Sequence, residues 1–456
     1  MLDKNIIEMR LTDKERAMIS DLYLYDRIIS LPLAHKYYFG NEFPKLKKMR
    51  NTTYKRLNKL CERKVLKKIP FEVKTENEYI YMLDQVGLFC VLQALNLDDN
   101  LYDGNRNIIK KNHKTLAELE LNRTSYSHQL ATVYARLATK RYLDNFQIED
   151  IVGYSKLFKD NSKMPDLFLH NNATNICFEI DMGTENATIF SNYMQRYISQ
   201  IYDYYRLQKE LKTVTIIVLL TNKTRIPISR ECVIYTSEED KQKEQLVANH
   251  NRYLNRMEKE KRKKKILLLN VLEEILKKHA NVYVYELLEY AHSDTSHIFE
   301  EHHNYLDLFY QRLEELSSSR NVSNSQLITK DTLKIGSHTL YANAFYSTSI
   351  LNNLNNEIPC QLIFYDYTHD NLQAISRCIS NIKAQSYITG QYFYNIFIIE
   401  TSNQMKEIDS FIENTKVFYI AYKDLSKPNL MSYILGYNRE DNNICKYTIP
   451  LTSREV

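Results

Sequence analysis

Two short apolar stretches separated by a polar turn constrain the fold of this chain most strongly. The first, LFLH, follows Pro165-Asp166, and the second, TNICFEID, ends in Glu179-Ile180-Asp181. Both have the length of a strand. Three carboxylates at the ends of neighbouring strands repel one another, and their burial costs free energy. The residues leave two explanations open: the carboxylates hold a metal ion, or the ends of two hairpin strands are acidic without a ligand.

The elements around these acids give a recognisable order. Residues 121–142 have helical periodicity, residues 145–158 have strand composition, and a long amphipathic segment over 186–212 precedes the apolar stretch TVTIIVLL. The predicted order is α-β-β-β-α-β. With Pro-Asp before one strand and Glu-x-Asp in the next, it resembles the core of restriction-endonuclease-like nucleases, the PD-(D/E)xK superfamily.

That resemblance implies a metal site. Asp166 and Glu179 would hold Mg²⁺ or Mn²⁺, since hard cations prefer carboxylate oxygens. Asp181 stands where the superfamily usually has lysine, so it would bind metal or position the attacking water. A replacement cation would come from Arg196 or Lys163. Two further polar residues are candidates for the site: His128, on the preceding helix, and Glu149, on the strand that follows it.

The N-terminal segment predicts a separate module over residues 10–96. Thr12 and Glu15 have the spacing of a capping box, and Ser30 and Gly40 bound a second helix. A third helix begins near Tyr54, and two strand-like pieces and a further helix follow it. Three helices and a hairpin are the order of a winged helix-turn-helix.

The third helix of this module is strongly basic. Between residues 45 and 68 there are eleven Lys or Arg residues and one acid, Glu62. In a winged helix this helix enters the major groove of double-stranded DNA, while lysines contact phosphates. Asn51, Thr53 and Arg56 would read base edges. The full predicted DNA-binding set is Asn51, Thr53, Lys55, Arg56, Lys59, Arg63, Lys64 and Lys67. The alternative is a small helical module that binds protein, with the lysines serving solubility.

A closer resemblance covers residues 10–225. The pieces YMLDQVGLFCVL, HQLATVYARL, PDLFL and FEIDMGTE, in this order, are similar to the replication-relaxation family of plasmids and integrative elements. The resemblance implies a role in replication or relaxation of mobile DNA, with a central nuclease-like domain over 115–225. Three function classes remain open. The chain is an Mg²⁺-dependent nicking enzyme, a non-catalytic origin-binding or regulatory protein that keeps the nuclease-like fold as a scaffold, or a structural adaptor whose C-terminal domain recruits replication or transfer partners.

The second half of the chain predicts structure more clearly than function. Residues 240–316 read as a helical segment, whose basic run over 259–265 is typical of a solvated face or a second DNA contact. Residues 327–456 alternate strand and helix, which predicts a second α/β domain serving dimerisation or replication and transfer partners. The fold class is therefore α/β multidomain. The seven cysteines lack C-x-x-C spacing, and no long apolar span occurs, so we expect a cytoplasmic protein without disulfides or membrane contact.

Overall fold

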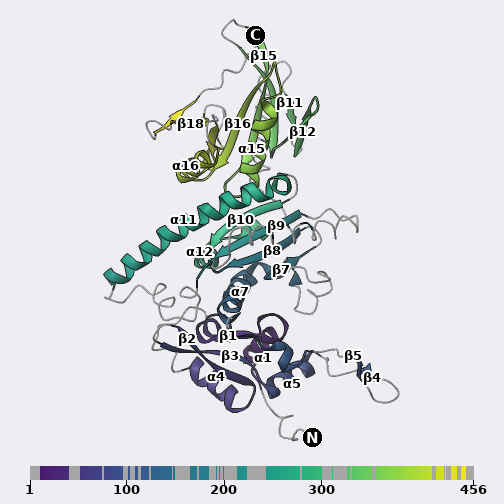
Figure 1. Ribbon diagram of the computed structural model, residues 1–456, viewed down its shortest axis with the longest axis vertical. Helices are drawn as coiled ribbons and strands as arrows, with labels where there is room; N and C mark the ends of the chain where they lie inside the picture. The colour runs from purple at the N-terminus through teal and green to yellow at the C-terminus, as the bar shows by residue number, and fades with distance from the viewer. Residues whose placement is uncertain are drawn as a thin grey trace.

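The computed structural model describes most of the predicted elements. The described residues are 11–40, 52–73, 76–95, 101–102, 108–110, 114–122, 125–145, 147–148, 165–171, 174–183, 192, 195, 199, 213–222, 243–277, 280–299, 311, 326–328, 331–351, 356–412, 417–425, 427, 433–438 and 443–447. The fold is mixed α/β. Figure 1 shows the N-terminal elements at one end, the C-terminal sheet at the other, and the long helix α11 crossing between the two.

The N-terminal region has the three helical segments and the hairpin that the sequence predicts. Thr12 and Glu15 form the expected capping box, and the Ser30 hydroxyl accepts a hydrogen bond from the Leu33 amide. A short strand that the sequence analysis missed, β1, completes a sheet of order β1-β3-β2. The elements are α1 (Asp13–Asp21), η2 (Leu22–Asp26), β1 (Ile28–Ser30), α2 (Leu31–Ala34), η3 (His35–Phe39), α4 (Thr53–Glu62), β2 (Leu66–Val73), β3 (Glu76–Leu83) and α5 (Gln85–Ala94).

Helix α5 packs closely on the start of β2 because it has a glycine at the contact. A Cβ atom on Gly87 would lie 2.1 Å from the carbonyl oxygen of Val65. The Asp84 amide donates to the same oxygen at 3.0 Å. A side chain at position 87 would therefore push the helix away from the turn that ends α4.

A buried ion pair joins the N-terminal region to the central one. Arg136 on α7 (Tyr126–Thr139) is 2% exposed, and its guanidinium donates to Asp26 Oδ1 at 2.6 Å. The same guanidinium donates to Asp21 Oδ2 at 3.2 Å. Because these charges are removed from water, loss of any one of them would leave an uncompensated buried charge. The contact therefore fixes α7 against the N-terminal helices.

The central sheet has the order β10-β9-β8-β7-β6. Strands β6 (Gln147–Ile148), β7 (Leu167–His170) and β8 (Thr174–Asp181) pair antiparallel, whereas β9 (Thr213–Leu220) is parallel to β8. The predicted strands at the acidic motif and at TVTIIVLL are confirmed. Phe178 and Ile180 of β8 pack toward α7, and Cys177 faces the other core, which contains Leu268 of α11.

Residues 240–316, which the sequence predicts to be mostly helical, also contain a strand. Helix α11 (Lys243–Leu276) is present, but β10 (Ala280–Glu286) follows it and pairs in parallel with β9. Its sequence, ANVYVYE, is rich in residues that favour strands, and a β-α-β order brings it beside β9. Short helices α12 (Leu287–His292) and α13 (Ser296–Phe299) follow.

The C-terminal region contains a second α/β sheet, as predicted. Its order is β11-β14-β15-β16-β17-β18-β19, with β15, β16 and β17 parallel and the outer pairs antiparallel. Its core is shared with α11 and the central sheet, so the two sheets pack on a common helix. The elements are β11 (Gln326–Ile328), β12 (Thr332–Ile335), β13 (His338–Tyr341), β14 (Ala344–Leu351), β15 (Glu357–Asp366), α15 (Leu372–Gln385), β16 (Tyr392–Ile399), α16 (Ser402–Phe411), β17 (Phe418–Ala421), η6 (Tyr422–Asp424), β18 (Leu435–Asn438) and β19 (Asn443–Lys446).

Four short elements complete the described chain: β4 (Leu101–Tyr102), β5 (Ile108–Lys110), α6 (Leu116–Leu119) and η5 (Lys140–Asn145). The cysteines that the structure describes are free thiols. Among the described helices, none has an apolar stretch that would cross a bilayer.

Candidate functional site

The predicted acids lie at the end of the central sheet where β7 begins and β8 ends. The Asp166 amide donates to the carbonyl of Phe178 at 2.9 Å, which continues the β7–β8 pairing by one residue. The Asp166 carboxylate turns back along the sheet edge, and its Oδ2 accepts a hydrogen bond from the Ile180 amide at 2.7 Å. Asp166 is therefore held rigidly beside the strand that carries the other two acids.

Helix α7 brings His128 to this carboxylate. His128 Nε2 lies 3.3 Å from Asp166 Oδ2. Burial of the imidazole opposes its protonation, but the hydrogen bond and charge of Asp166, together with the charge of Glu179, outweigh burial and raise the pKa of His128. The predicted candidate His128 thus lies in contact with the predicted acid Asp166.

Glu179 and Asp181 are both buried, with 2% and 5% of their surface exposed. Side chains alternate along a strand, so the two acids share the face of β8 that carries Cys177 and packs toward α11. Asp181 Oδ2 lies 2.6 Å from Lys264 Nζ, and its Oδ1 accepts from the Gly183 amide at 2.8 Å. Asp181 is thus paired with a lysine, and its predicted roles, binding the metal or positioning the attacking water, stay predictions.

Lys264 is a site residue that sequence reasoning missed. It belongs to the basic run over 259–265, and the run as a whole is typical of a solvated face. Its position on α11 carried a signal, because Met257, Lys261, Lys265 and Leu268 are spaced three to four residues apart and are buried. That buried stripe shows which side of α11 faces the sheet, and Lys264 lies at its edge.

The acids of this site offer two carboxylates, not three, for binding a hard cation. Asp166 and Glu179 offer the oxygens that Mg²⁺ prefers, whereas the charge of Asp181 is already matched by Lys264. Within the described residues, no three His, Cys, Asp or Glu side chains lie together closely enough to hold a metal ion. A metal at this place would therefore be bound by Asp166 and Glu179, with remaining ligands from water or substrate.

Three other predicted candidates, Arg196, Lys163 and Glu149, lie outside the described residues, and their roles remain predictions. The same holds for Asn51 in the N-terminal region.

The predicted base-reading role of Thr53 conflicts with its position. Thr53 is 1% exposed, and its hydroxyl lies 2.6 Å from His35 Nδ1. The first turn of α4 is thus fastened to η3, and Thr53 is turned inward. The pattern of polar residues at the start of α4 could not reveal this contact, because the partner belongs to another helix.

Arg56 is partly engaged within the protein. Its guanidinium lies 4.9 Å from the centre of the Phe39 ring, and its Nε is 3.5 Å from Glu15 Oε1. These residues line a groove of about 510 Å³ between α1 and α4, which Lys55 and Lys59 border.

The remaining cations of the predicted set point outward. Lys55, Lys59, Arg63 and Lys64 are exposed on α4 and the turn that follows. Lys67, on β2, is also exposed but lies 3.2 Å from Glu120. The basic surface of the N-terminal region therefore consists mainly of α4 and its C-terminal turn.

Comparison with known proteins gives one result that bears on this site. No curated protein and no solved structure matches the chain. A family model, described as Replication-relaxation, matches residues 40–216, which include α4, the β2–β3 hairpin and the strands that carry Asp166 and Glu179. The resemblance predicted from the motifs is therefore confirmed over residues 40–216.

Proposed function

We propose that this chain is a DNA-binding protein of a mobile genetic element, acting in its replication, relaxation or transfer, and that it nicks DNA in an Mg²⁺-dependent reaction. The observation that carries the proposal is the contact of His128 with Asp166 at one end of the central sheet, where the charge of Glu179 also acts on His128 and Lys264 pairs with Asp181. The family match over residues 40–216 supports the role in replication or relaxation.

Each residue of the site has a distinct task in this proposal. Asp166 and Glu179 hold the metal ion, which when bound polarises the scissile phosphate and lowers the pKa of a water. His128 holds the Asp166 carboxylate in place. In the sequence motif, Asp181 stands where the superfamily usually has a lysine. Lys264 supplies the missing positive charge near the phosphate, and Asp181 positions the Lys264 ammonium group.

The N-terminal region is proposed to act as a winged helix. Helix α4 would enter the major groove, and the β2–β3 hairpin would contact the backbone. Lys55, Lys59, Arg63 and Lys64 are exposed on α4 and the turn after it, as phosphate contacts require. Replacing Lys55 and Lys59 with Gln should lower the slope of log affinity against log salt by about 1.8, since each lost phosphate contact contributes about 0.9.

Nicking of supercoiled plasmid that carries the cognate origin tests the catalytic part. The wild type should nick in Mg²⁺ or Mn²⁺, and the double variant Asp166→Asn with Glu179→Gln should not. A matched control, Asp331→Asn with Glu357→Gln, removes the same charges from exposed positions of the C-terminal region and should keep activity.

A second function is favoured by one observation: Asp181 is neutralised by Lys264, which leaves two carboxylates for a metal. In that case the chain is a non-catalytic origin-binding protein. The same experiment separates the two, because a wild type that binds the origin but leaves the plasmid supercoiled in both metals has only the binding function.

A further inference from the structure

Helix α11 carries eight cations over residues 252–265 but only two acids, Glu258 and Glu260. The cations divide into two sets by burial. Three face the body of the protein: Lys261, Lys264 and Lys265. Five are exposed: Arg252, Arg256, Lys259, Arg262 and Lys263.

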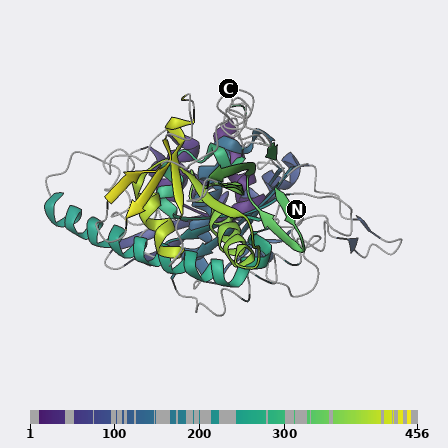
Figure 2. The same cartoon turned by 90° about the horizontal axis from the view of Figure 1, so that it is seen from above.

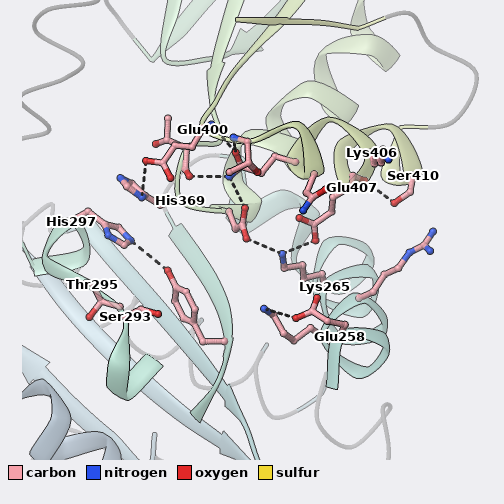
Figure 3. Close-up of a pocket in the computed structure, with 18 of the residues that line it drawn as sticks. Glu258, Lys265, Ser293, Thr295, His297, His369, Glu400, Lys406, Glu407 and Ser410 are labelled. Atoms are coloured by element: carbon pink, nitrogen blue, oxygen red, sulfur yellow. Dashed lines mark hydrogen bonds and ion pairs between the residues drawn. The ribbon is translucent and has the colours of Figure 1, made fainter. Parts of the chain in front are cut away.

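Each inward lysine is matched by a carboxylate from a different part of the fold. Lys261 Nζ lies 3.0 Å from Glu289 on α12, and Lys264 pairs with Asp181 on β8. Lys265, which is 2% exposed, lies 2.7 Å from Glu407 on α16. Figure 3 shows Lys265 and Glu407 in a cavity of about 650 Å³ between α11 and the C-terminal region. The inward charges are therefore neutralised, and they fix how α11 is rotated.

The outward cations are compensated far less within the part of the chain that the structure describes. Arg252, Arg256, Lys259 and Lys263 recur at spacings of four, three and four residues, which places them in one line along the helix. Among the described residues, the one carboxylate paired with this line is Glu260, 3.0 Å from Lys263. That pair is exposed on both sides and weak. The N-terminal half of α11 projects beyond the central sheet in both views, so the line lies open to solvent (Figures 1 and 2).

We propose that this outward line of α11 is a second DNA-binding surface, which holds the phosphate backbone of the duplex beside the candidate site. The inference rests on the proposed function, since it takes DNA as the substrate. Eleven residues of helix extend about 16 Å. That length faces about five phosphates of one strand at about 3.4 Å per charge. Lys264 follows Lys263 in sequence and lies about a quarter of a turn round the helix, so the line is next to the flank of α11 that carries this site residue.

The chemistry of the line favours nucleic acid over other anionic partners. An interfacial membrane helix buries an apolar face in the lipid. Among the side chains of α11 that the structure describes, Ile266 is the exposed large apolar residue, so the described part of the outward side presents no such face. A row of cations along a straight rod instead matches the evenly spaced charges of a nucleic-acid backbone.

Salt-dependent binding to a duplex of unrelated sequence tests the inference. The triple variant Arg252→Gln, Arg256→Gln and Lys259→Gln keeps long, helix-favouring side chains and removes three charges. We expect the slope of log affinity against log salt to fall by about 2.7. The matched control removes three exposed lysines of the C-terminal region, by Lys334→Gln, Lys423→Gln and Lys446→Gln, and should keep the wild-type slope.

The outcomes distinguish this inference from the proposed function. An α11 variant with the wild-type slope, measured beside a Lys55→Gln, Lys59→Gln variant that loses slope, refutes the α11 surface and leaves DNA binding intact. Equal losses in the α11 and control variants also refute it, because net charge alone would then explain the effect. A wild type that binds no duplex at low salt overturns both proposals.

Discussion

Removal of the Lys264 ammonium tests whether the Asp181 pair is as buried as the structure indicates. Lys264→Met leaves the Asp181 carboxylate, which is 5% exposed, with the hydrogen bond from the Gly183 amide at 2.8 Å. Breaking a buried pair from one side costs about 3–5 kcal/mol, and the retained amide contact places the expected loss near about 3 kcal/mol. Asp181→Asn keeps an acceptor for Gly183 and for Lys264, so it should cost about 1–2 kcal/mol. The double variant should cost less than the sum of the two.

Urea unfolding followed by far-ultraviolet circular dichroism measures these losses, because the chain has no tryptophan for fluorescence. A loss of about 3 kcal/mol shifts the midpoint by roughly 1 M for a steep transition. Lys383→Met is the matched control: its ammonium also lies 2.6 Å from a carboxylate, that of Glu273, but the lysine is 62% exposed. That variant should cost less than about 1 kcal/mol. Equal midpoints for the two lysine variants would refute the argument, since the Asp181 carboxylate would then be solvated.

Three further predictions concern other contacts. The pKa of His128 is raised in the folded protein, so its contact with Asp166 stabilises the fold fully below the unfolded imidazole pKa of about 6.5. This stabilisation is lost as the pH rises through the folded pKa. The difference in melting temperature between wild type and His128→Gln should therefore shrink as the pH is raised from about 6 to about 8. Arg136→Met leaves two buried aspartates without their cation and should cost about 3–5 kcal/mol in urea unfolding, whereas an unchanged midpoint would contradict the burial of the pair. Gly87→Ala should cost about 1–3 kcal/mol, because the new Cβ meets the Val65 carbonyl; a melting temperature equal to that of wild type would show that α5 can shift freely.

The elements around the candidate site could be read from the sequence because their signals are local. The strands with Asp166 and Glu179 are continuous apolar stretches, and their limits agree with β7 and β8 to within about two residues. The helix that carries His128 has clear helical periodicity, and the capping box at Thr12 is present in the structure. Local pattern was enough to bring Asp166 and Glu179 onto neighbouring strands.

The contacts that complete the site could not be read in this way. Lys264 reaches Asp181 only because α11 packs on the face of β8 opposite to α7, which depends on the topology of the whole sheet. Thr53 is buried by His35, which lies on another helix. Strand β10 was hidden because a long helical pattern preceded it, although its residues alternate as strand residues do. The contacts of Lys264 and Thr53 depend on tertiary partners, whereas β10 was missed although its own residues carried a local strand signal.

The three inward lysines of α11 also restrict how the length of this helix can change. A single residue inserted between Arg252 and Lys261 would rotate everything before it by about 100° and carry the outward line toward the flank of the helix, while the pairs of Lys261 and Lys265 stayed in place. An insertion of about seven residues, two full turns, would restore the direction to within about 20°. Insertions and deletions in this half of α11 should therefore be tolerated in steps of two turns and disfavoured as single residues.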